Sequence, residues 1–220
     1  MKKTVVFWGL LLTFFATELS AQITHTSKGA VDQNAEKVLK ESARVVNAAP
    51  VSFVVTMINH DADGKETARK KANVLYYKGK YRVSFDNNVI YCDGKTSWHW
   101  NKDANEVVVN NVVSSDDDLM NPAAILSSYT NNFKAKYIRN EEATKTVVID
   151  LTPYKAKSYH KIRLLVSQST HWPSSMTLHN YDGTRGEYRM GEFKSGVKVS
   201  DSDFRFQTES NKNVEVIDMR

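Results

Sequence analysis

Several short stretches of the sequence hold residue types that could do chemistry, but each lacks a part that the chemistry requires. Gly94-Lys95-Thr96 has the form of the end of a phosphate-binding loop, yet Val89 stands where the first glycine of that loop must be. Asp61-Ala62-Asp63-Gly64 has the form of the start of a calcium loop, yet its twelfth position holds Ala72 instead of a glutamate. No G-x-S-x-G or H-E-x-x-H motif occurs. These stretches favour hairpin turns, and we predict that the protein is not an enzyme.

The remaining reactive side chains are scattered and form no ligand or triad spacing. The single cysteine, Cys92, excludes an intramolecular disulfide, and its strand-like surroundings predict a small buried residue. Asp116-Asp117-Asp118 is expected to keep a loop solvated and to favour the N-terminus of a following helix. We therefore predict no cofactor and no metal site. Five of the six histidines are scattered over turns and strand segments and receive no chemical role: His60, His99, His160, His171 and His179.

The N-terminal 21 residues predict export from the cytoplasm. Lys2 and Lys3 precede an apolar run from Val5 to Phe15, and Leu19-Ser20-Ala21 supplies small residues at a cleavage site, as in a signal peptide. No cysteine follows the predicted cut, so we expect a soluble, exported domain over residues 22–220 without a lipid anchor. Loss of Lys2, Lys3 and Glu18 lowers the net charge from +5 to +4. The charges are interspersed, which argues against nucleic acid as a partner.

The rest of the chain is typical of one mainly β domain. Residues 31–47 have the spacing of an amphipathic helix, and a short apolar helix is predicted after Asn121-Pro122. Residues 72–100 alternate apolar and polar side chains between turns such as Asp93-Gly94-Lys95, which predicts an antiparallel meander. About eleven strands are expected, with no linker and no internal repeat.

The apolar faces of these strands must be covered. Either two helices fill an ordinary core, or an open, curved sheet encloses a cavity large enough for a lipid and closed by small movable helices. Both interpretations fit the composition. The residues predicted to line the apolar face are Leu39, Phe53, Val55, Met57, Tyr81, Val83, Phe85, Trp98 and Trp100.

Several motifs occur in an order that is specific when taken together. They are Lys78 to Phe85, Asp93-Gly94-Lys95-Thr96-x-Trp98-x-Trp100-Asn101, Asn121 to Leu126, Asp150-Leu151-Thr152-Pro153, and Gly196 to Phe206. In this order the sequence resembles the LolA/LolB-like family of periplasmic lipoprotein carriers over nearly the whole exported chain. The resemblance implies an incomplete antiparallel β-barrel of about eleven strands, with an N-terminal helix and a central helical lid over a hydrophobic cavity.

The resemblance also implies roles for particular residues and partners. The lid would be formed by Pro122, Ile125, Leu126 and Tyr129, and Lys78 stands where many members carry an arginine that bonds to the lid. The implied function is a monomeric chaperone that binds the acyl chains of outer-membrane lipoproteins. It would receive them from an inner-membrane transporter and deliver them to the outer membrane, where a receptor is a further possible partner. The alternative is a periplasmic lipid-binding sensor, or a carrier of another envelope lipid, on the same fold.

Overall fold

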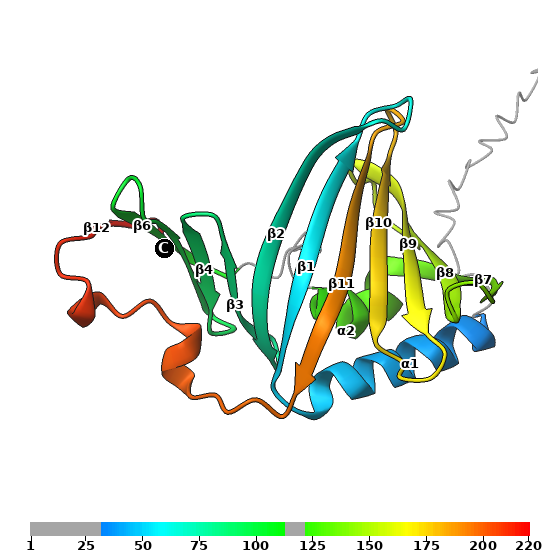
Figure 1. The fold of residues 1–220 in the computed structure, drawn as a ribbon, viewed down its shortest axis with the longest axis horizontal. Coiled ribbons are helices and arrows are strands. Elements are labelled where there is room, and N and C mark those ends of the chain that lie inside the picture. The colour runs from blue at the N-terminus through cyan, green and yellow to red at the C-terminus, as the bar shows by residue number, and fades with distance from the viewer. Residues whose placement is uncertain (1–31, 113–121) are drawn as a thin grey trace, which may run out of the picture.

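The computed structural model describes residues 32–112 and 122–220, and in that part the chain forms one open β-sheet with two α-helices (Figure 1). The predicted signal peptide and Asp116-Asp117-Asp118 lie outside the described residues. The helices are α1 (Gln33–Ala48) and α2 (Pro122–Asn132). The strands are β1 (Val51–His60), β2 (Glu66–Tyr77), β3 (Lys80–Phe85), β4 (Asn88–Cys92), β5 (Thr96–Asn101), β6 (Glu106–Asn111), β7 (Phe133–Glu141), β8 (Thr146–Pro153), β9 (Tyr159–Ser167), β10 (Pro173–Asn180), β11 (Arg185–Ser195) and β12 (Glu215–Asp218).

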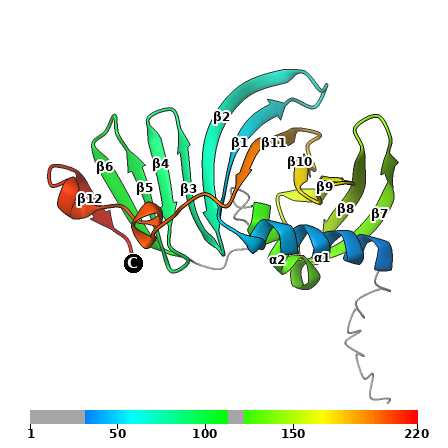
Figure 2. The same ribbon diagram turned by 60° about the horizontal axis from the view of Figure 1, so that its bottom comes forward.

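The twelve strands lie in the order β12-β6-β5-β4-β3-β2-β1-β11-β10-β9-β8-β7. Neighbouring strands are antiparallel except β12, which pairs parallel with β6. Because β12 and β7 are the two ends of this order, the sheet does not close. The predicted incomplete barrel with an N-terminal helix is therefore confirmed, with one strand more than the eleven expected. Figure 2 shows the sheet curving over α1 and α2 on one side, while β3–β6 extend away from them.

Helix α1 forms where the sequence supplies both a cap and an apolar stripe. The carboxylate of Asp32 accepts hydrogen bonds from the backbone N–H groups of Asn34 and Ala35, each at 3.1 Å. Its second oxygen accepts one from the N–H of Tyr137 on β7 at 2.9 Å, so one side chain caps the helix and occupies a sheet edge. These bonds lower the pKa of Asp32. The buried side of the helix carries Ala35, Leu39, Ser42 and Val46, which are spaced three or four residues apart.

The tight turns of the meander lie where turn chemistry predicts them. Lys78 and Gly79 join β2 to β3 with φ angles of 47° and 81°, and a two-residue turn of that kind needs positive φ at both positions. Asp86 (φ 48°) and Gly94 (φ 90°) take the same region between the following strands. The side chain of Asp93 accepts from the N–H groups of Lys95 and Thr96, both at 2.9 Å. Local residue types thus determine where these strands reverse.

Strand pairing separates the residues of the sheet into two faces. Phe53 lies opposite Val74, which lies opposite Val83, so these three side chains point to the same side. That side faces the helices, and we call it the inner face. Its buried residues form one apolar cluster together with side chains of α1 and α2. From the second half of the sheet the cluster takes Val147, Ile149, Leu151, Ile162, Leu164, Met176, Leu178 and Met190.

One hydrogen-bonded contact ties α1 to the meander. The buried hydroxyl of Tyr76 donates to Oδ1 of Asn47 at 2.9 Å and accepts from the N–H of Gly79 at 3.0 Å. Asn47 lies in the last turn of α1, and its amide donates to the carbonyl of Ala43 at 2.8 Å. Ala49 is extended before Pro50, and the contact with Tyr76 holds the last turn of the helix against β2.

We expect Tyr76→Phe to lower the free energy of unfolding by about 1–3 kcal/mol, because it leaves Asn47 and the Gly79 N–H without their partner. Chemical denaturation followed by circular dichroism measures the change. Tyr77→Phe, at the adjacent and less buried tyrosine, is the matched control and is expected to change stability little. Equal stabilities of the Tyr76→Phe variant and the parent would show that this contact does not hold the helix.

Candidate functional site

The inner face brings together most of the residues predicted to line a cavity. Phe53 and Val55 on β1, Tyr81 and Val83 on β3, and Leu39 on α1 are all buried in the same apolar cluster. Met57 and Phe85 are partly buried and pack against that cluster. These seven residues come from three separate stretches of the chain. Their role as a wall for an acyl chain stays a prediction.

Trp98 and Trp100 lie on the opposite face, which corrects the prediction that they share an apolar face with Tyr81 and Phe85. Tyr81 pairs with Cys92, whereas Trp98 pairs with Tyr91. Because adjacent residues of β4 point to opposite faces of the sheet, Tyr81 and Trp98 lie on opposite faces. The ring of Trp100 lies 5.4 Å from that of Phe206, and the C-terminal segment thereby covers this outer face. The outer cluster of β4–β6 consists of Val89, Tyr91, Trp98, Trp100, Val107, Val109 and Phe206.

Helix α2 covers part of the inner face. Ile125, Leu126 and Tyr129 are each at most 6 % exposed and belong to the same cluster as Phe53 and Tyr81. Figure 2 shows α2 beside α1 on the concave side of the sheet. Pro122, the fourth predicted lid residue, begins the helix.

The hydroxyl of Tyr129 is buried and has no hydrogen-bond partner among the described residues. Burial, and next the nearby carboxylate of Glu36, raise the pKa of this tyrosine. An unsatisfied buried hydroxyl costs free energy, so the burial of Tyr129 depends on the apolar contacts of its ring. The last residue of α2, Asn132, accepts a hydrogen bond from the N–H of Tyr154 at 2.9 Å, which joins this end of the helix to the residue after β8.

Lys78, the predicted lid latch, lies in the β2–β3 turn. Its ammonium group is 5.2 Å from the centre of the Tyr77 ring. It makes no ion pair or hydrogen bond with the described side chains of α2. The described part of the structure therefore does not bring Lys78 and the lid residues together. Within that part, the contact that joins this turn to a helix is the one from Tyr76 to α1.

An aromatic stack on the inner face was not foreseen from the sequence. The ring of Phe193 lies 5.4 Å from Phe53 and 4.8 Å from Trp172, and both Phe193 and Trp172 pack against the apolar cluster. Phe193 follows Glu192, which has a φ of 56° at a register shift between β1 and β11. A β-bulge of this kind re-aims a side chain, and the sequence carries no local signal for it apart from a charged residue in a strand.

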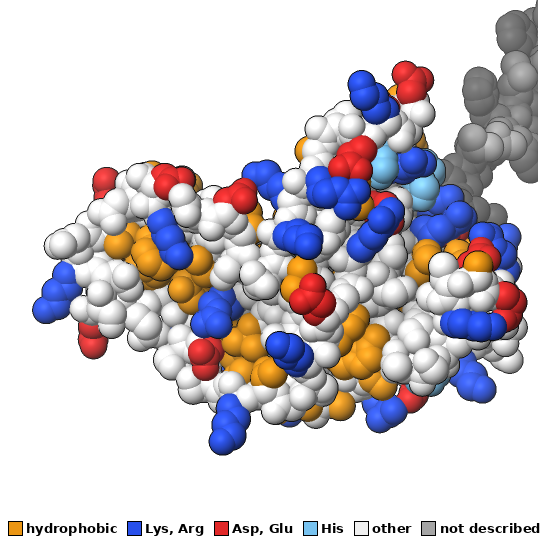
Figure 3. Space-filling view, in the orientation of Figure 1, with side chains coloured by type: hydrophobic (Ala, Val, Ile, Leu, Met, Phe, Trp, Pro, Cys, Tyr) orange, Lys and Arg blue, Asp and Glu red, His pale blue; other side chains and the backbone are white. Residues whose placement is uncertain are grey.

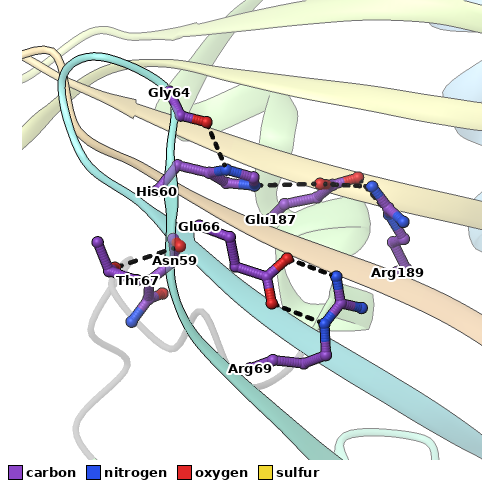
Figure 4. A network of polar contacts seen from close by, with 8 residues as sticks. All are labelled: Asn59, His60, Gly64, Glu66, Thr67, Arg69, Glu187 and Arg189. Atoms are coloured by element: carbon purple, nitrogen blue, oxygen red, sulfur yellow. Dashed lines mark hydrogen bonds and ion pairs between the residues drawn. The ribbon is translucent and has the colours of Figure 1, made fainter.

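The outer face of β1, β2 and β11 carries a polar network that accounts for His60 (Figure 4). Nδ1 of His60 lies 3.2 Å from the carbonyl of Gly64, and Nε2 lies 3.6 Å from Glu187, which also accepts from Arg189 at 2.7 Å. Glu66 and Arg69 form a neighbouring pair. No group of three His, Cys, Asp or Glu residues in the described ranges is placed to hold a metal ion. His60 therefore joins the hairpin to the sheet.

Figure 3 shows cationic and acidic side chains interspersed on the outer side of β1, β10 and β11. Farther along this face, Asp150 accepts two hydrogen bonds from Arg163 at 2.7 and 2.8 Å, and Lys161 lies 3.6 Å away. Burial alone would raise the pKa of Asp150, but the two cations outweigh it and the pKa is lowered. These cross-strand pairs link β8 to β9.

We expect the stabilisation by Asp150 to disappear in acid. A carboxylate with a lowered pKa in the folded state contributes stability above its unfolded pKa of about 3.9, and loses it as pH falls through the folded value. Asp150→Asn should therefore be less stable than the parent at pH 7, and the difference should shrink below about pH 4. Denaturation at several pH values measures this, with Asp63→Asn in an exposed turn as control. A difference that is constant with pH would contradict the assignment.

We expect Phe206→Ala to lower the free energy of unfolding by about 3 kcal/mol, because it removes a buried ring from the outer cluster. Val216→Ala, at a residue that is 46 % exposed, is the control. Since Phe206 lies on the face away from the helices, binding of acyl ligands by the folded variant should be unchanged. Loss of binding without loss of structure would place the ligand on the outer face.

Comparisons with known proteins agree with this architecture. The model of the family "Outer membrane lipoprotein carrier protein LolA" matches residues 79–207, and the chain belongs to that family. The match covers β3 to β11 and the segment with Phe204 and Phe206. The family is one of carriers, not a known enzyme family. A search of curated proteins gives no match.

Solved structures are similar to this chain at low sequence identity, and the first of the three described here has a TM-score above 0.5 and shares the fold. An uncharacterized conserved protein from Thermus thermophilus is 13 % identical with a TM-score of 0.59, over 84 % of this chain and 99 % of that one. A LolA superfamily protein from Nitrosomonas europaea is 14 % identical with a TM-score of 0.45, over 78 % and 97 %. A putative outer membrane lipoprotein-sorting protein domain from Vibrio parahaemolyticus is 12 % identical with a TM-score of 0.46, over 81 % and 100 %.

Proposed function

We propose that this protein is a periplasmic carrier that binds the acyl chains of lipoproteins against the inner face of its sheet and moves them from the inner to the outer membrane. The observation that carries the proposal is the shared cluster of wall and lid. Phe53 and Tyr81 on the sheet, and Leu126 on α2, are buried together in an open sheet that α2 covers. Membership of the LolA family supports the same function.

The energetics of such a site favour tight binding. Each buried CH₂ group of an acyl chain contributes about 0.8 kcal/mol, so one long chain contributes roughly 10 kcal/mol without any directional bond. Binding at that strength would prevent delivery unless something opposes it. The side chains of α2 occupy the inner face, and an entering chain must displace them. The cost of displacing α2 lowers the net affinity and favours release.

The remaining parts of the proposal follow from the same role. Residues 1–21 act as a signal peptide, and residues 22–220 form the carrier domain in the periplasm. Within the described ranges, no helix has both the length and the apolar character needed to cross a bilayer. The partners are lipoproteins, an inner-membrane transporter that loads the carrier, and a possible receptor in the outer membrane. The protein works as a monomer and needs no cofactor of its own.

We expect Leu126→Asp to leave a folded protein that cannot hold a lipoprotein in soluble form. The carboxylate can reach water if α2 moves away from the sheet, which keeps the fold but destroys the apolar cover. Release of lipoproteins from spheroplasts into a soluble complex measures loading. Phe85→Glu, on the opposing wall, is expected to abolish loading as well.

The control is Met219→Asp, because this methionine is 68 % exposed and lies at the C-terminal end of the chain. Circular dichroism verifies that each variant is folded before its loading is compared. Equal loading of the parent and folded Leu126→Asp would contradict the lid, and equal loading of folded Phe85→Glu would contradict the wall. Native mass spectrometry of the gently purified parent identifies the bound lipid. Another envelope lipid in place of a lipoprotein would favour the alternative carrier.

A further inference from the structure

A groove lies between α1 and the strands β7 and β8, where the inner face reaches the edge of the sheet. Its volume is about 790 Å³, which is within the range of about 300–1,000 Å³ typical of small-molecule sites. α1 runs along the open lower side of the sheet in Figure 1. The groove is lined by Asn34, Lys37, Val38, Lys40, Glu41, Arg44, Tyr137, Asn140, Val147 and His171. We call this hollow the α1–β7 groove.

The lining of the α1–β7 groove has two chemical parts. Val38, Tyr137 and Val147 are apolar, and all three belong to or pack against the apolar cluster under the sheet. The groove thus includes an apolar strip that continues the protein core. Around it lie polar and charged side chains, of which three, Lys37, Lys40 and Arg44, are cations from one side of α1.

The charges of this rim do not balance. Lys40 lies 2.7 Å from Glu36, and Arg44 donates to Glu41 at 2.9 and 3.1 Å. Lys37 makes no ion pair within the described residues. Lys37, Lys40 and Arg44 against Glu36 and Glu41 therefore leave one positive charge in excess. The amides of Asn34 and Asn140, and the imidazole of His171, add hydrogen-bonding groups around the same opening.

We propose that the α1–β7 groove binds an anionic amphiphile, with its alkyl chain on the strip of Val38, Tyr137 and Val147 and its anionic oxygen group near Lys37 and Lys40. The assignment rests on complementarity. An apolar strip next to surplus positive charge fits a molecule that is apolar at one end and anionic at the other. The proposal does not depend on lipoprotein carriage, because α2 and the wall residues Phe53 and Tyr81 do not line this groove.

The test is calorimetric titration of the purified protein with dodecyl phosphate, below its micelle concentration and at low ionic strength. We expect saturable binding, and binding at least about tenfold weaker for Lys37→Gln/Lys40→Gln, which loses two charge-assisted contacts. Lys212→Gln, an exposed lysine near β12, is the matched control and should bind like the parent. Circular dichroism establishes that the three proteins are equally folded.

Two further ligands separate the sources of affinity. Dodecyl maltoside has the alkyl chain without the anion, and inorganic phosphate has the anion without the chain. Each should bind at least about tenfold more weakly than dodecyl phosphate. Equal binding of the maltoside would show that charge plays no part, and equal binding of inorganic phosphate would show that the apolar strip plays none. Either result overturns the proposal.

The inner face could also take up an alkyl chain, so a last comparison distinguishes the two sites. Phe85→Glu alters the wall of the inner face and leaves the α1–β7 groove unchanged. We expect this variant to bind dodecyl phosphate through the groove with the parent's affinity, even where lipoprotein loading is lost. If Phe85→Glu abolishes binding and Lys37→Gln/Lys40→Gln does not, the amphiphile occupies the inner face and the groove assignment is wrong.

Discussion

An open sheet has an apolar face that its own curvature cannot bury, and this constraint organises the whole structure. A closed barrel of about eight strands can fill its interior with side chains from its own strands. Here the strand order ends at β12 and β7, so two helices must supply the missing cover. α1 is joined to the sheet by hydrogen bonds, from the N–H of Tyr137 on β7 to Asp32 and from the hydroxyl of Tyr76 on β2 to Asn47. α2 buries Ile125, Leu126 and Tyr129 in the apolar cluster, and its last residue, Asn132, accepts a hydrogen bond from the N–H of Tyr154 at 2.9 Å. Both helices therefore contribute to the cover of the inner face.

Local patterns in the sequence predicted much of this architecture. Alternation of apolar and polar residues located the strands, and residues such as Gly79 and Gly94 located the turns, because both signals act over a few residues. The helical spacing of Leu39 and Val46 located α1 in the same way. Leu39, Phe53 and Tyr81 could be assigned to one buried cluster without knowing the fold, since each lies on the more apolar side of its own element.

Features that depend on distant parts of the chain could not be predicted in this way. Each strand alternates, but which of its sides turns inward depends on the pairing register, and the opposite placements of Tyr81 and Trp98 follow from the pairs across β4. Phe206 covers Trp100 from about a hundred residues away, and no short-range pattern links them. Lys78 was assigned to the lid from its place in a motif. The left-handed turn that holds it was visible in the sequence, but the direction of its side chain was not.

The ends of the sheet also bear on how such a protein behaves when it is abundant. A bare edge strand offers its N–H and C=O groups to any other extended chain, and two such edges on one molecule would let copies join end to end. The edge of β6 is paired with β12. β12 begins at Glu215 and ends at Asp218, and both residues are carboxylates. At β7 one of the amides, that of Tyr137, is taken by Asp32. The same side chains thereby discourage end-to-end pairing of copies through the two edges of the sheet.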